Sequence, residues 1–97
     1  MAKHKFLLHE HEDSVGVAVA DITKGEKVYG AFLHGDELVE VVANSDIPLG
    51  HKIAIKNVAK GEFVIKYCEK IGLATQDIRV GDWVHTHNLK GARWGKK

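Results

Sequence analysis

The sequence predicts a small all-β protein with short strands and at most one short helical turn. Three observations support this fold class. In several short segments, apolar and other residues alternate with the period of two that strands show. No segment keeps apolar residues at helical spacing for long enough to indicate a helix. A glycine-containing turn pattern recurs between the short segments, which indicates a compact, much-folded β unit.

The candidate strands follow one another closely along the chain. In the second of them, Val15, Val17 and Val19 alternate with smaller residues. The branched side chains of this strand would therefore lie on one face and the small ones on the other. The expected strands cover residues 5–9, 15–20, 27–33, 37–42, 52–56, 63–67, 71–75 and 83–87.

A short pattern occurs three times, beginning at Asp21, Asn57 and Asp77. Each copy has Asp or Asn, a branched aliphatic residue, two variable residues, Gly, an acid, one variable residue and Val. We expect the aliphatic residue in the core, the glycine in the left-handed turn conformation and the acid exposed where the turn ends. The copies start 36 and 20 residues apart, and this irregular spacing argues against a solenoid. We interpret them as structural corners between strands.

Composition limits the classes of partner and compartment. With 14 Lys and Arg against 13 Asp and Glu, the net charge is +1, which argues against a nucleic-acid partner. The single cysteine, Cys68, cannot form an internal disulfide. Apolar runs are too short for a signal peptide or a membrane span, which predicts a cytoplasmic protein without a membrane partner. Residues 1–97 are expected to form one domain that ends in a basic tail at about 89–97.

The 7 histidines are the first indication of function. Two pairs, His9 with His11 and His85 with His87, have one residue between them. In a strand, such side chains point to the same side and could converge on one metal ion or one anionic ligand. Two imidazoles do not complete a metal site, because zinc or iron needs further ligands. We favour a polar strand edge for the first pair, whereas for the second pair, which follows Trp83, a pocket lining is equally open.

A second candidate is the segment around His51. This residue follows a glycine and precedes Lys52, so a titratable imidazole lies beside a fixed positive charge. That combination suits a carboxylate or sulfonate, and His51 could also transfer a proton near neutral pH. A structural turn with two exposed polar side chains is the alternative. The sequence contains no phosphate-binding loop, nucleophile elbow or cysteine cluster, so the residues alone predict only an anion-binding patch around His51, His85 and His87.

Nearly the whole chain resembles the N-terminal domain of altronate dehydratases. The resemblance rests on the ordered segments Gly50-His51-Lys52-Ile53-Ala54, Ile65-Lys66-Tyr67 and His85-Thr86-His87-Asn88, with residues 13–18 similar to the opening strand of that family. Galactarate dehydratases are related, and the residues 89–94 look closer to the separate small (alpha) subunit of (2R)-sulfolactate sulfo-lyases. Cys68 departs from the family, which usually has Gly there, and this puts any role of Lys66 or Tyr67 in doubt.

This resemblance implies a SAF-type domain with the β-clip fold, and a part in β-elimination of water or sulfite from a hydroxy acid with the help of a divalent metal, expected to be iron. The chain would be a small subunit or N-terminal domain, inactive alone, that adds substrate-binding residues to a site shared with a large catalytic subunit. Carried over by position, His51, Lys52 and Asn88 would bind the substrate, and His51 is also the candidate catalytic residue. His85 and His87 are the candidate metal ligands.

Two other functions stay open at this point. A β-clip domain could be a stand-alone binding module for a sugar acid or small anion, because a fold does not determine a function. Binding of a sugar acid without any partner would favour that module. The two histidine pairs could alternatively make the chain a metal carrier, and uptake of iron or zinc by the dialysed protein would favour this third hypothesis.

Overall fold

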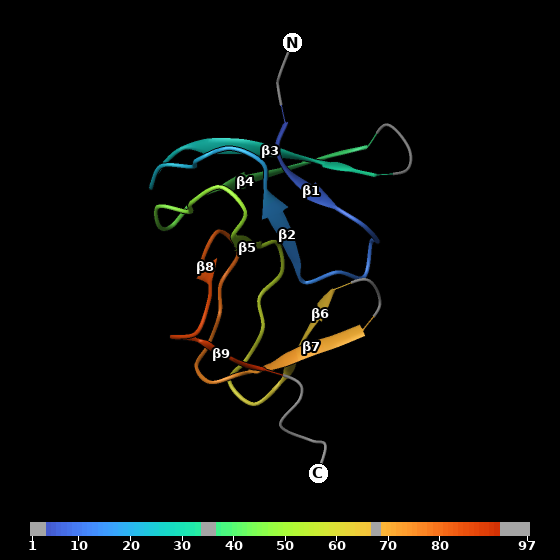
Figure 1. Ribbon diagram of the computed structural model, residues 1–97, viewed down its shortest axis with the longest axis vertical. Helices are drawn as coiled ribbons and strands as arrows, with labels where there is room; N and C mark the ends of the chain where they lie inside the picture. Colours follow the sequence, from blue (N-terminus) through green and yellow to red (C-terminus); the bar gives the residue numbers. More distant parts are fainter. Residues whose placement is uncertain (1–3, 34–36, 67–68, 92–97) are drawn as a thin grey trace.

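The computed structural model describes residues 4–33, 37–66 and 69–91. These residues form nine short strands and no helix, which confirms the all-β class (Figure 1). None of them belongs to a helix that could cross a membrane. The strands are β1 (His4–Leu8), β2 (Val15–Ala18), β3 (Lys27–Phe32), β4 (Leu38–Val42), β5 (Lys52–Ala54), β6 (Phe63–Lys66), β7 (Glu69–Ala74), β8 (Trp83–Val84) and β9 (Leu89–Gly91).

The strands form two sheets. A six-stranded sheet has the order β4-β3-β1-β2-β5-β8, and a three-stranded sheet has the order β6-β7-β9. Only the pairing of β1 with β3 is parallel among the strand pairs of the described residues. In Figure 1, β1, β3 and β4 lie towards one end of the long axis, and β6, β7 and β9 lie towards the other. The strands β5 and β8 lie between these two groups.

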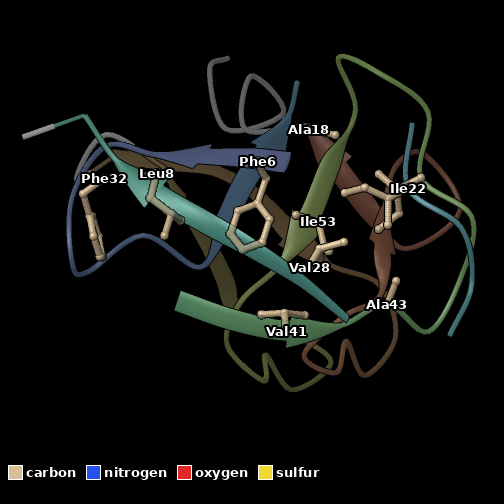
Figure 2. Packing of buried hydrophobic residues seen from close by; sticks show 10 residues of the cluster. Phe6, Leu8, Ala18, Ile22, Val28, Phe32, Val41, Ala43 and Ile53 are labelled. Carbon is tan, nitrogen blue, oxygen red and sulfur yellow. The ribbon is translucent and has the colours of Figure 1, made fainter. Parts of the chain in front are cut away.

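Buried apolar residues form two clusters, and the larger one surrounds Phe6, which is fully buried (Figure 2). Gly16 and Gly30 make room for its ring, since a Cβ atom would lie 2.7 Å and 1.9 Å from ring carbons at these two positions. The small-residue face of β2 therefore packs against Phe6, while Val19 lies beyond β2 and is 40% exposed. The second cluster joins β2, β5 and β8 to the three-stranded sheet and comprises Val15, Ala54, Val58, Val64, Ala74, Ile78 and Val84.

The three predicted corners are confirmed in their glycines and their aliphatic residues. The φ angles of Gly25, Gly61 and Gly81 are 87°, 91° and 95°, and the aliphatic residues are at most 5% exposed. The acids were expected to be exposed, but only Glu62 is, whereas Glu26 and Asp82 are half-buried. Each carboxylate accepts a hydrogen bond from a backbone N–H three residues earlier. These bonds join Glu26 to Thr23 (3.0 Å), Glu62 to Ala59 (3.1 Å) and Asp82 to Arg79 (2.8 Å).

A fourth corner, missed in the sequence, begins at Asp46. Its aliphatic residue is the fully buried Ile47, and Gly50 has a φ of 87°. The pattern was not recognised because His51 stands in the place of the acid and Ile53 in the place of the final valine. The backbone turn is nevertheless the same. The backbone N–H of His51 donates to the carbonyl of Pro48, as the backbone N–H of the acid donates to the carbonyl three residues earlier in each of the other corners.

The four corners associate in two pairs through reciprocal contacts. One pair contains the bridge between Ile22 and Ile47, and the other contains the bridge between Val58 and Ile78. In each pair, the side chain that opens one corner accepts a hydrogen bond from the backbone N–H that precedes the glycine of the other. The donor and acceptor pairs are Leu49 to Asp21 (2.9 Å), Lys24 to Asp46 (2.8 Å), Val80 to Asn57 (3.0 Å) and Lys60 to Asp77 (2.9 Å).

Three expectations for single segments need correction or lie outside the described residues. The strand expected over residues 83–87 ends at Val84, and residues 85–88 form a turn. Of the basic tail expected at about residues 89–97, Leu89–Gly91 form the strand β9 and pair with β7. Residues 92–97, together with Tyr67 and Cys68, lie outside the described residues.

Candidate functional site

The rings of His51, His85 and His87 gather around Trp83. The ring centroids lie 5.7 Å, 5.2 Å and 5.3 Å from that of Trp83, and the rings of His51 and His85 lie 4.9 Å apart. The indole and the His85 ring are nearly parallel, with 9° between their planes. The structure thus brings together the three histidines that the sequence predicted as one patch. We call these four side chains the imidazole cluster.

Two features of the fold bring His51 to Trp83. His51 ends the fourth corner directly before β5, and Trp83 opens β8. Because β5 and β8 pair with Ile53 opposite Trp83, the indole lies near the start of β5. Its Nε1–H donates a hydrogen bond of 3.1 Å to Nδ1 of His51. His51 and Trp83 are both partly buried, so this bond is shielded on one side.

The turn that carries His85 and His87 is held by Asn88. This residue is only 3% exposed. Its Oδ1 accepts from the N–H of His85 at 2.9 Å, and its Nδ2 donates to the carbonyl of Trp83 at 2.9 Å. These bonds explain why β8 ends early, since they stabilise the turn in place of a strand. The amide of Asn88 therefore positions the turn, and its expected contact with a substrate stays a prediction.

A small polar pocket of about 170 Å³ lies beside Trp83 and His87. It is below the size of roughly 300–1,000 Å³ that encloses most small-molecule ligands. The pocket is lined by Ser45, Gln76, Asp77, Asp82, Trp83, His87 and Asn88. A larger pocket of about 360 Å³ shares none of these residues and is lined mainly by apolar side chains, such as Leu7, Val17 and Leu33.

Lys52 does not join the imidazole cluster. It pairs with Val17 on one side and Val84 on the other, whereas Trp83 pairs with Ile53. Neighbouring residues of a strand point to opposite faces, so the side chain of Lys52 leaves the sheet on the face opposite to Trp83. Within the described residues, no hydrogen bond or ion pair links Lys52 to the cluster. Its expected contact with a substrate carboxylate also stays a prediction.

The other histidine pair lies away from the cluster, in the segment after β1. His11 stacks on Phe32 with ring centroids 4.3 Å apart, and its Nε2 lies 2.5 Å from Oε1 of Glu37. The hydrogen bond with Glu37 is the main cause that raises the pKa of His11 above its ordinary value. His11 is thus engaged with a carboxylate and an aromatic ring.

The described residues offer no complete set of metal ligands. No group of three or more His, Cys, Asp or Glu side chains among them could hold a metal ion. To bind zinc or iron, His85 and His87 would therefore need further donors from outside the residues that the structure describes. The ring of His51 has one nitrogen engaged with Trp83, which leaves only Nε2 for any other contact.

The match of the chain to a family of known proteins covers nearly all of the structure just described. Residues 4–92 match the altronate/galactarate dehydratase SAF domain. The chain belongs to this family. The resemblance predicted from the sequence is confirmed, and the nine short strands are the small all-β fold expected of a SAF domain.

The relatives fall into two groups that differ in length. The chain is 40% identical over 90 residues to (2R)-sulfolactate sulfo-lyase subunit alpha of Chromohalobacter salexigens, an alignment that covers 92% of this chain and 96% of that one. It is 52% identical over 54 residues to the same subunit of Paracoccus pantotrophus, over 56% of this chain and 81% of that one. Altronate dehydratase of Bacillus subtilis is 36% identical over 85 residues, which are 88% of this chain but 16% of the dehydratase.

Proposed function

We propose that this SAF domain is the small subunit of a two-component lyase that removes sulfite or water from a hydroxy acid by β-elimination. The observation that carries the proposal is the extent of the match. One sulfo-lyase alpha subunit is 40% identical to this chain over 90 residues, and these residues make up 96% of that subunit. A subunit named alpha implies at least one further subunit, and we propose that the further subunit is large and catalytic.

The imidazole cluster is the surface that we propose to face this partner. The cluster combines three imidazoles and an indole with a pocket of only about 170 Å³. A substrate in so small a pocket would stay largely in water, where hydrogen bonds to charged groups are weak. A second subunit laid over the cluster would close the site and exclude water.

The chemistry that this chain contributes is recognition of an anion. Imidazole N–H groups donate hydrogen bonds to a carboxylate or sulfonate, and the indole provides a flat apolar wall beside them. A divalent metal, which we expect to be iron, would polarise an oxygen of the hydroxy acid in the shared site. The described residues do not fit such a metal by themselves, so we assign no step of the reaction to it.

The test is to co-express the chain with a candidate large subunit from the neighbouring reading frame and to measure β-elimination. Sulfolactate, altronate and galactarate are supplied separately, with ferrous iron, to the complex and to each chain alone. We expect turnover only when both chains are present, and a loss of at least tenfold in His51→Ala or His87→Ala. The matched control is His11→Ala, which removes an exposed imidazole outside the cluster and should leave turnover unchanged.

Two results would overturn this proposal. Full turnover by the large subunit without this chain would remove any role in the shared site. Binding of a sugar acid by this chain alone in calorimetry, combined with no turnover by any complex, would favour a stand-alone binding module instead.

A further inference from the structure

His51 stands at a corner position where the fold otherwise places an acid. In the other three corners, this acid accepts a hydrogen bond from the backbone N–H of the third corner residue. In the fourth corner the third residue is Pro48, which has no N–H to donate. A carboxylate at position 51 would therefore find no backbone N–H at the third corner residue from which to accept a hydrogen bond. The corner folds without it, and the side chain of His51 is free for another task.

The contact that orients the His51 ring is the hydrogen bond from Trp83. An indole N–H can only donate, so Nδ1 of His51 must be an unprotonated acceptor when the bond forms. A neutral imidazole carries one proton, and this proton must then be on Nε2. The neutral ring thus has no unprotonated nitrogen left to accept a proton from a substrate.

Trp83 is itself held firmly enough to impose this state. Its backbone pairs with Ile53 in the sheet, and its carbonyl accepts a hydrogen bond from Asn88. Its side chain packs against the larger core cluster and stacks on the ring of His85. A side chain held by packing and stacking on a fixed backbone keeps the direction of its N–H, so the His51 ring cannot rotate without losing the bond.

We propose that Trp83 is a positioning residue that holds His51 as an N–H donor to an anionic group of the substrate, a carboxylate or a sulfonate, and withholds it from general-base catalysis. The substrate contact rests on the function proposed above. The orientation and protonation of the ring rest only on this chain. The chemical role of His51, open between binding and proton transfer in the sequence, is thereby assigned to binding.

The first experiment reads the ring nitrogens of the full chain by NMR. The chain has 2 tryptophans, and the background variant Trp94→Phe removes one of them so that the remaining indole signal belongs to Trp83. At a pH where His51 is neutral, long-range proton–nitrogen spectra should show a protonated Nε2 and an unprotonated Nδ1. In Trp83→Phe, the two nitrogen shifts should move towards each other as both tautomers become populated. A protonated Nδ1 in the background variant would overturn the proposal.

A second variant covers the case in which Trp83→Phe does not fold. In His51→Ala the indole N–H loses its acceptor, so its exchange with solvent should become at least severalfold faster. The backbone amide spectrum should stay close to that of the wild type. An unchanged exchange rate of the indole N–H would contradict the bond.

The second experiment uses the active complex and separates binding from proton transfer. Trp83→Phe should raise KM roughly tenfold, which corresponds to one lost hydrogen bond, with a smaller change in kcat. The amide of Gln donates an N–H but cannot transfer protons. The KM of His51→Gln should therefore be raised less than that of His51→Ala. A kcat as low in His51→Gln as in His51→Ala, together with a lost limb of the pH–rate profile, would show a general base and overturn the proposal.

The two experiments also distinguish this inference from the proposed function. If no complex has lyase activity but the NMR experiment shows the expected protonation, the lyase function and the substrate contact are wrong and the role of Trp83 in orienting His51 stands. If activity is present and Nδ1 carries the proton, the function stands and the role of Trp83 is wrong.

Discussion

The glycine of the last corner is expected to tolerate a methyl group far less well than the equivalent glycines of two other corners. Gly25, Gly61 and Gly81 share a left-handed conformation, with φ between 87° and 95°. An alanine in this conformation costs about 1–2 kcal/mol. At Gly25 and Gly61 nothing lies within 4 Å of an added Cβ, so this backbone cost should be the whole effect.

Gly81 differs from these two only in the space around it. An added Cβ would lie 2.2 Å from the carbonyl oxygen of Val42 and 3.2 Å from the backbone nitrogen of Asn44. Backbone atoms in a sheet cannot rotate away as a side chain can, so overpacking should add about 1–3 kcal/mol. The total loss of unfolding free energy in Gly81→Ala is then about 2–5 kcal/mol.

Urea unfolding followed by circular dichroism measures this difference. We expect Gly81→Ala to unfold at a clearly lower urea concentration than Gly25→Ala, which is the matched control. In thermal unfolding, the two variants should differ by at least about 4 °C in Tm, because about 1 kcal/mol shifts the Tm of a domain of this size by about 4–8 °C. Equal stability of the two variants would refute the contact between the last corner and Val42.

Three further predictions follow from the side chains. Glu37→Gln should lower the pKa of His11 in an NMR titration, and an unchanged titration midpoint would contradict the pairing of His11 with Glu37. Because the pKa of His11 is raised in the folded state, the stability due to the pair is present below the ordinary pKa of His11 and is lost as pH rises through the raised value. Asn88→Ala removes two hydrogen bonds of a buried amide and should cost about 1–3 kcal/mol in urea unfolding, whereas a loss below about 0.5 kcal/mol would show that the turn does not depend on it. The double change Pro48→Thr with His51→Glu gives the fourth corner the hydrogen bond between the acid and a backbone N–H that the other corners have. Its free energy of unfolding should stay within about 1 kcal/mol of the wild type, while turnover by the complex is abolished. Retained turnover would show that His51 has no part in the site.

Local patterns in the sequence were sufficient to predict the fold class and three of the four corners. Alternation with a period of two depends only on neighbouring residues, and the conformation of Gly25, Gly61 and Gly81 is required by the turn itself. The fourth corner was missed because its acid is replaced by His51. That replacement becomes intelligible only when the absent N–H of Pro48 is compared with the donors of the other corners.

The histidine patch was predicted for a reason that the structure corrects. His85 and His87 were expected to share the face of one strand, but the amide of Asn88 forms a turn there instead. The hydrogen bond from Trp83 to His51 joins residues 32 positions apart in the sequence. Such a contact depends on the pairing of β5 with β8, which periodicity in one short segment cannot reveal.

The most direct test of the central claim is to titrate the purified large subunit with this chain and to follow the rate of β-elimination from sulfolactate, altronate and galactarate. With each substrate below its KM, we expect no rate without the chain, a rise that saturates at a fixed ratio of the two subunits, and a plateau at least tenfold lower with His51→Ala. A large subunit that is fully active by itself, and does not respond to the wild-type chain, would contradict the shared site.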